Sequence, residues 1–201
     1  MNFKGPIIST VRLSGTQQDF ATLKQELAAY LSAFSSDPQP FTLTTVSGGL
    51  PSNQQVILAD IQTCNRCTLT FDKDNRGPFA GLFHVRLKGL RVWFHGVKSK
   101  ATAGAETIVK VQIETNGLYG DFSESSFFMF ATTPLRRIFW YQLENSGPGK
   151  VLVDSVIPDG FHNPPTPFTQ WTVTLMNPID LDLSGLTSIT FEWVGTTYGC
   201  M

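Results

Sequence analysis

The residues best suited to chemistry are two cysteines, Cys64 and Cys67, which form a Cys-x-x-Cys pair. A structural zinc site needs two further ligands at a matching spacing, and the sequence offers Cys200 and three dispersed histidines. A redox pair would place its first cysteine at the head of a helix after a strand, whereas 68–71 has the pattern of a strand. An incidental or locally oxidised pair is therefore the favoured interpretation, with metal binding and redox work as alternatives.

Two groups of acidic residues could bind a cation or act as acid and base. The stretch Asp72–Gly77 begins like a calcium-binding EF-hand loop, but Arg76 and Phe83 stand where ligands are needed. A solvated turn is expected there, and a calcium ion that braces a loop is the alternative. Asp180 and Asp182 share one face of an extended segment, but nothing around them supports a glycosidase pair.

The common catalytic motifs are absent from the sequence. It holds no Gly-x-Ser-x-Gly elbow, no Walker loop, no His-Glu-x-x-His and no Gly-x-Gly-x-x-Gly. We therefore expect a protein that is not an enzyme and that has no catalytic residues, no metal site and no cofactor. An enzyme would need a concave site with convergent titratable groups, and it remains the less favoured alternative.

The composition limits the classes of binding partner that we expect. Charged residues make up 15% of the chain, against about 25% in typical soluble proteins, and the formal net charge is −1. Nucleic acid is not expected as a partner, because there is no basic field to attract it. No window is apolar enough to span a membrane, and the N-terminus does not have the pattern of a signal peptide. The expected location is the cytoplasm, or outside the cell after export by a non-classical route.

The elements that must position any site begin with one helix. Residues 16–34 carry apolar side chains at steps of three and four, which predicts an amphipathic helix after an extended arm at 1–15. We expect residues 1–40 to form this arm and helix, packed on a sandwich domain of residues 41–201. Docking of the helix on a partner chain is the alternative.

After Pro40 the pattern becomes that of strands. Apolar and polar residues alternate in short runs separated by turn residues, which predicts an all-β, antiparallel, jelly-roll-like β-sandwich with one N-terminal amphipathic α-helix. The side-chain parity switches at Gly89, which predicts a β-bulge. The runs at 127–130 and 138–143 are apolar on both faces, so central or covered strands are expected. The predicted strands are 41–46, 55–59, 68–71, 83–97, 109–114, 127–130, 138–143, 151–157, 171–175 and 189–193.

Two of the four tryptophans supply the candidate binding surface. Trp171 and Trp193 share the parity of the predicted core, whereas Trp93 and Trp140 oppose their apolar neighbours and should be at least partly exposed. A tryptophan that points outward from a sheet has three explanations: a helix or loop covers it, it lies in a protein interface, or it stacks against sugar rings. The predicted ligand-binding residues are Trp93, Trp140, Arg91 and Tyr119, with a protein partner or a cell-surface glycan as the ligand and an oligomer allowed.

The second half of the chain resembles β-sandwich segments near the C-terminus of large toxin-complex A-type insecticidal proteins. The residues that carry the resemblance are Leu90–Gly96, Phe130–Arg137, Pro165–Thr172 and Asp180–Thr187. The resemblance covers about half of the chain and consists of strand and turn patterns. It implies a non-enzymatic module for assembly or cell-surface binding in a larger secreted complex, and it assigns no chemical role to any residue. The narrower alternative is a carbohydrate-binding module with an exposed aromatic platform.

Overall fold

The computed structural model describes residues 22, 24, 25, 38–46, 54–100, 107–123, 126–143, 149–157 and 164–198. The chain divides into two compact units, Met1–Ser36 and Asp37–Met201. In the first unit, Thr22, Lys24 and Gln25 are helical, and the rest of the expected arm and helix lies outside the described residues. In the described part of the chain, no helix has both the length and the apolar character needed to cross a membrane.

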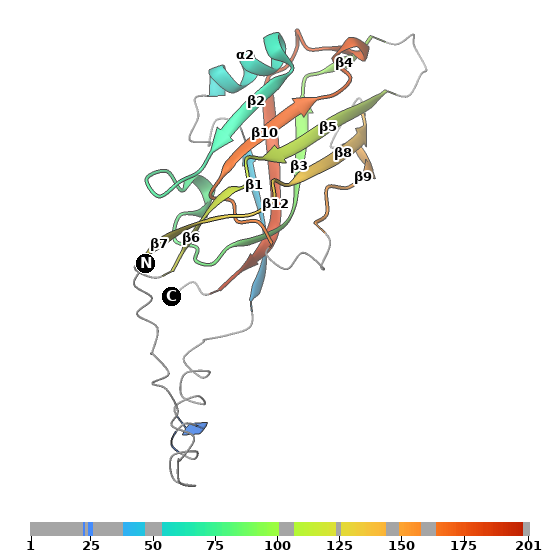
Figure 1. The fold of residues 1–201 in the computed structure, drawn as a ribbon. Helices are drawn as coiled ribbons and strands as arrows, with labels where there is room; N and C mark the ends of the chain where they lie inside the picture. Colours follow the sequence, from blue (N-terminus) through green and yellow to red (C-terminus); the bar gives the residue numbers. More distant parts are fainter. Residues whose placement is uncertain are drawn as a thin grey trace. The chain divides into compact units, whose positions relative to one another are not determined.

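The second unit contains two main antiparallel sheets and two short strand pairs (Figure 1). The three-stranded sheet has the order β1 (Gln39–Val46), β12 (Ser188–Thr197) and β3 (Arg86–His95). The five-stranded sheet has the order β2 (Arg66–Thr70), β10 (Gln170–Leu175), β5 (Ile108–Thr115), β8 (Arg136–Gln142) and β9 (Lys150–Val153). β1 lies beside β12 in the three-stranded sheet, and β2 lies beside β10 in the five-stranded sheet. This order is that of a jelly roll, so the predicted fold class is confirmed.

Smaller elements complete the unit. In one short strand pair, β4 (Lys98–Ser99) lies antiparallel to β11 (Leu181–Asp182). In the other, β6 (Leu118–Phe122) lies antiparallel to β7 (Phe127–Ala131). The helical segments are α2 (Gln54–Cys64) and the 3-10 turns η2 (Gly77–Phe79) and η3 (Pro178–Asp180).

The core lies between the two sheets and is rich in aromatic rings. Along β12, Ile189, Phe191 and Trp193 are buried while the residues between them are partly exposed, as the period of two requires. Trp193 of one sheet packs edge-on against Trp171 of the other, with ring centroids 5.6 Å apart. The predicted burial of Trp171 and Trp193 is therefore confirmed.

The bulge predicted at Gly89 is present. In the ladder between β12 and β3, Val194 pairs with Gly89 and Gly195 pairs with Leu87, so Lys88 is the additional residue. This extra residue restores the phase of the strand, because Leu87 and Leu90 are both buried although they are three positions apart. The same bulge exposes the carbonyl of Lys88, which accepts a 2.7 Å hydrogen bond from the Ile157 amide.

The free edge of β3 is covered by the segment that follows β9. The Ser155 hydroxyl accepts a hydrogen bond from the Leu90 amide and donates one to the Leu90 carbonyl. The Tyr141 hydroxyl of β8 accepts a 3.0 Å hydrogen bond from the Phe94 amide. These bonds satisfy backbone groups that an edge strand would otherwise present to solvent, and they close this side of the sandwich.

One predicted strand is wrong. Residues 55–59 lie in the helix α2, in which Ile57 and Ile61 are buried and Val56 is half exposed. The spacing of four between the two isoleucines places them on one helical stripe. The apolar run Val56–Leu58 does not alternate, and a short run of this kind does not distinguish a strand from a helix.

The expectation that 127–130 forms a central or covered strand is also wrong. This run is β7, which among the described strands pairs only with β6. Its residues Phe128 and Met129 are 53% and 55% exposed. The similar run at 138–143 does meet its expectation, because β8 lies between β5 and β9.

Candidate interaction surfaces

Trp93 is buried, so its expected exposure is wrong. The residue is 9% exposed, and its ring centroid lies 5.0 Å from that of Phe139 and 4.8 Å from that of Tyr141. Parity places Trp93 away from Val92 and Phe94, yet all three are buried. The reason is that β3 is the last strand of its sheet, where side chains of β8 enclose it from a second direction. Sequence parity predicts the face of a strand but not the cover at its edge.

Tyr119 is fully buried and offers no surface to a ligand. Its hydroxyl lies 2.5 Å from the Thr115 hydroxyl, and its ring stacks on Phe130 with centroids 5.7 Å apart. Burial raises the pKa of Tyr119 above its ordinary value. The side chain therefore anchors β6 to the end of β5. The neighbouring Asn116-Gly117 turn in the sequence does not indicate that Tyr119 is buried.

Arg91 is held in an ion-pair cluster. Its guanidinium donates to both carboxylate oxygens of Asp154, from Nε to Oδ1 at 3.0 Å and from Nη2 to Oδ2 at 2.6 Å, and from Nη1 to Glu192 at 2.7 Å. Hydrogen bonding to Asp154 raises the pKa of Arg91 and lowers the pKa of Asp154. The fork geometry uses most of the donors, so the cluster ties β3 to β12 and to the segment after β9. The predicted role of Arg91 in binding a ligand stays a prediction.

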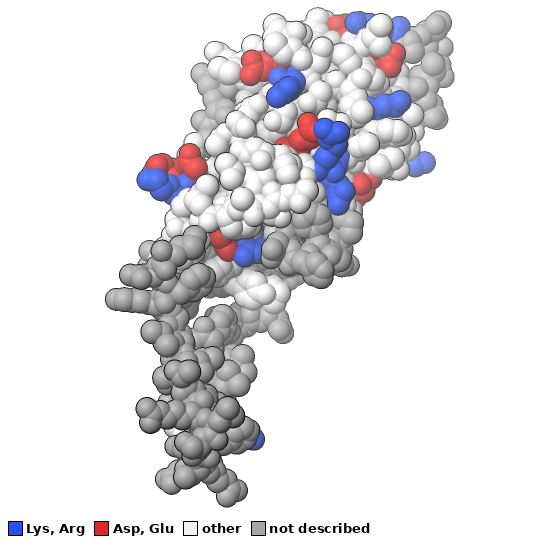
Figure 2. Space-filling model, viewed as in Figure 1, with Lys and Arg blue, Asp and Glu red and all other residues white. Residues whose placement is uncertain are grey.

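Trp140 keeps partial exposure, as expected. It projects from the outer face of the five-stranded sheet, where it pairs across the strands with Lys110 on one side and Val153 on the other. The Lys110 ammonium lies 5.0 Å from the centroid of the indole ring, which is the geometry of a cation–π contact. Ile138 and Val153 on the same face are 37% and 38% exposed. Charged residues are sparse over the described part of the surface seen in Figure 2.

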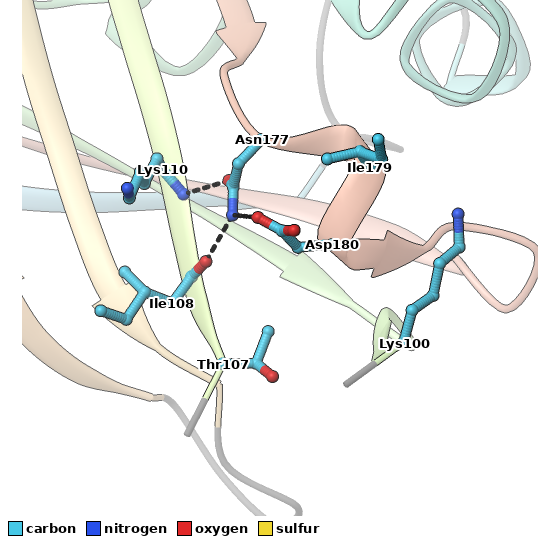
Figure 3. A pocket seen from close by; sticks show the side chains of 7 residues that line it. All are labelled: Lys100, Thr107, Ile108, Lys110, Asn177, Ile179 and Asp180. Carbon is cyan, nitrogen blue, oxygen red and sulfur yellow. Dashed lines mark hydrogen bonds between the residues drawn. The ribbon is translucent and has the colours of Figure 1, made fainter. Parts of the chain in front are cut away.

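A pocket of about 450 Å³ adjoins Lys110 (Figure 3). The Asn177 side chain lines it; this side chain accepts a hydrogen bond from the Lys110 amide at 2.9 Å and donates to the Ile108 carbonyl at 2.8 Å and to Asp180 at 3.2 Å. In Figure 3 the ammonium groups of Lys100 and Lys110 lie on opposite sides of the pocket and do not converge. The pocket is lined by Lys100, Thr107, Ile108, Lys110, Asn177, Ile179 and Asp180.

The two cysteines of the Cys-x-x-Cys pair are free thiols in different surroundings. Cys64 is exposed at the C-terminal end of α2, and Cys67 is buried in β2. Burial raises the pKa of the Cys67 thiol to about 12, so this thiol stays protonated at neutral pH. Cys64 ends a helix rather than beginning one, which removes the geometry expected of a redox pair. Among the described residues, no group of three or more His, Cys, Asp or Glu could hold a metal ion.

The acidic loop at 72–77 is a turn, as expected. The Asp72 carboxylate accepts hydrogen bonds from the amides of Asp74 and Asn75, at 2.9 and 2.8 Å. This is the Asx-turn arrangement that short acidic side chains form with their own backbone. The two other acidic residues considered, Asp180 and Asp182, lie in η3 and β11, and Asp182 accepts a 3.0 Å hydrogen bond from the Ser184 amide.

The surface that sequence reasoning missed is the hairpin patch, which we define as Leu118, Phe128 and Met129 on β6 and β7. Their exposed fractions are 53%, 53% and 55%. By register, Leu118 and Met129 share one face of the hairpin and Phe128 lies on the other. The run Phe127–Phe130 gave a usable signal: a strand that is apolar at every position exposes half of its side chains unless both of its faces are covered.

Comparison with known proteins gives a distant structural likeness. No family model matches the chain, and no curated protein matches it. Among solved structures, the cryo-EM structure of Yersinia pseudotuberculosis TcaA-TcaB is similar to 90% of this chain, with 11% sequence identity and a TM-score of 0.39. This chain spans 11% of the length of that one. The likeness is weak and carries no argument about function.

Proposed function

We propose that this protein is a non-enzymatic binding module that takes part in a larger protein assembly through the hairpin patch. The observation that supports the proposal is the exposure of three large apolar side chains, each by more than half, on one two-stranded hairpin. Scattered single apolar residues are normal on a protein surface, whereas exposed apolar residues that lie together, as Leu118 and Met129 do on one face of the hairpin, are typical of a protein-binding site. Because the sequence resembles toxin-complex A-type proteins, we propose that this assembly is a large toxin-like complex.

Oxidative footprinting of methionine tests this proposal. Met129 lies in the hairpin patch at 55% exposure, and Met176 lies outside it at 46% exposure. In the purified chain at low concentration, hydroxyl radicals should oxidise both methionines to a similar extent. In the cells that naturally produce the protein, a partner on the hairpin patch should protect Met129 and leave Met176 reactive.

The comparison within one molecule controls for dose and for folding, because both methionines report from the same sample. Protection of Met129 alone supports the proposal. Equal oxidation of the two residues in cells and in the purified chain would show that nothing covers the hairpin patch, and the proposal would then fail.

A second candidate function is glycan binding at Trp140. The observation that favours it is the partly exposed indole on an outer sheet face, next to Lys110 and the pocket that Lys110 lines. Indole faces pack against the apolar faces of sugar rings, and amide, carboxylate and ammonium groups bind hydroxyls. A glycan array probed with and without calcium tests this function. Binding that is lost in Trp140→Ala supports it, and an array without hits removes it.

A further inference from the structure

The turn between β5 and β6 places a glycine directly after an exposed asparagine, Asn116. Gly117 has a φ of 82°, in the left-handed region that favours glycine. A β-carbon at this position would lie 2.7 Å from the Thr132 carbonyl oxygen, so the close approach of that backbone also requires glycine. The fold therefore requires an Asn-Gly pair whose second residue has no side chain to shield its backbone nitrogen.

The Asn116 carboxamide is held by hydrogen-bond donors. Its Oδ1 accepts a 3.0 Å bond from the Leu118 amide, in the Asx-turn arrangement. The Thr169 hydroxyl lies 3.0 Å from the same oxygen and 2.6 Å from the Leu118 carbonyl, so its one proton is shared between them. Donors at this oxygen stabilise the negative charge that develops on it when a nucleophile adds to Cγ. The contacts that fix the turn therefore also activate the carboxamide carbon.

The Gly117 backbone nitrogen is the nucleophile that the same turn supplies. Gly117 is buried, yet no hydrogen bond among the described residues uses its amide. Most buried amides in folded proteins are bonded, because an unpaired one is costly. The Gly117 carbonyl does take part in the backbone pattern, since it accepts a 2.9 Å bond from the Thr132 amide. The nitrogen is therefore left uncommitted beside an activated carboxamide.

We propose that Asn116 is a site of spontaneous deamidation in the folded protein. The Gly117 nitrogen loses its proton to hydroxide and bonds to Asn116 Cγ, which closes a five-membered ring. The carboxamide nitrogen takes up a proton and leaves as ammonia, so a cyclic succinimide remains. Water then opens the ring at either carbonyl and leaves aspartate or isoaspartate in place of Asn116. The reaction consumes water alone and needs no oxidant or cofactor.

The two products differ in their effect on the turn. Aspartate keeps an acceptor for the Leu118 amide, and its charge strengthens that bond. Isoaspartate carries the main chain through the former side chain, which adds one methylene group to the backbone and displaces that acceptor. Both products add a negative charge two positions from Leu118 of the hairpin patch. The reaction thus alters the border of this surface, and it does not depend on the function proposed above.

The other described asparagines lack this combination of features. Asn65 and Asn75 are each followed by an arginine, whose side chain hinders approach to the backbone nitrogen. Asn177 is followed by Pro178, which has no N–H to lose. Deamidation through a succinimide should therefore be selective for Asn116 among these four residues.

Peptide mapping of the purified full chain after timed incubation in mildly alkaline buffer tests the proposal. The tryptic peptide Val111–Arg136 contains one asparagine, Asn116, whereas both asparagines of Val151–Met201 precede proline. We expect the first peptide to gain progressively the mass of an amide-to-acid exchange and the second to stay unchanged. The rate in the folded chain should lie within about tenfold of the rate in urea. Succinimide and isoaspartate should both be detected in the first peptide.

A variant assigns the reaction within that peptide. Asn116→Gln would need a six-membered ring and should leave the peptide unmodified, which controls for reaction at Gln112. Asn116 that stays intact in the folded chain, while the urea-unfolded chain is converted, overturns the proposal, because the turn then protects the asparagine. An undiminished mass gain in Asn116→Gln also overturns it. Aspartate formed with neither succinimide nor isoaspartate would indicate direct hydrolysis by water and would remove the role of Gly117.

Discussion

Arg91 and Asp154 face each other in a two-pronged ion pair that joins β3 to the segment covering its edge, with atoms 3.0 and 2.6 Å apart. Glu192 of β12 binds the same guanidinium at 2.7 Å. Both partners in the main pair are about 30% exposed, so solvent screens them only in part. The pair therefore fastens a strand that would otherwise be the open side of the three-stranded sheet.

Removing this guanidinium should destabilise the protein. Arg91→Gln leaves two partly buried carboxylates without their common partner, and we expect a loss of about 1–3 kcal/mol in the free energy of unfolding. Arg136→Gln is the matched control, because its pair with Glu114 is an exposed one and should contribute about 0–1 kcal/mol. Urea denaturation of both variants measures the difference. Equal losses in the free energy of unfolding would show that the cluster around Arg91 stabilises the protein no more than the exposed pair does.

The same pair predicts a dependence of stability on pH. Hydrogen bonding to Arg91 lowers the pKa of Asp154 in the folded protein below its unfolded value of about 3.9. The stabilisation is therefore fully present above that unfolded pKa and is lost as the pH falls through the lower, folded pKa. Below about pH 4, Asp154→Asn should lose less stability with falling pH than the wild type does. Parallel stability curves for the two proteins over this range would contradict the assignment.

Trp93 should behave as a core residue. Trp93→Ala removes a ring that contacts Phe139 and Tyr141, and cavities of this kind cost about 3–5 kcal/mol. Trp140→Ala removes a half-buried ring from the outer face and should cost clearly less. Thermal unfolding of the two variants makes the comparison. A loss at Trp93 no larger than that at Trp140 would place Trp93 outside the core.

Thiol reactivity should separate the two cysteines of the Cys-x-x-Cys pair. In a Cys200→Ser background at pH 8, iodoacetamide should label Cys64 at the rate of an exposed thiol. Cys67 should react only after unfolding, because it is buried and its pKa is raised to about 12. Mass spectrometry of tryptic peptides identifies the labelled residue. Rapid labelling of Cys67 in the native protein would restore the redox interpretation.

Period-two alternation predicted the sandwich because burial of one sheet face leaves a direct record in the sequence. The bulge beside Gly89 was predictable for the same reason, since the core face of β3 switches parity there. The alternation carries no information about which strands lie at an edge. For this reason the alternation predicts an exposed Trp93 and a covered run at 127–130. In the structure Trp93 is buried, and Phe128 and Met129 are more than half exposed.

The ordering of strands also has a consequence for biosynthesis. β1 forms its ladder with β12, from residues 39–46 to residues 190–197, and β2 pairs with β10. A nascent chain can complete the three-stranded sheet only after β12 has left the ribosome, and it can pair β2 only after β10 has done so. High contact order of this kind slows folding, so a chain stalled before β12 would hold Phe41 and Leu43 without the neighbours they need.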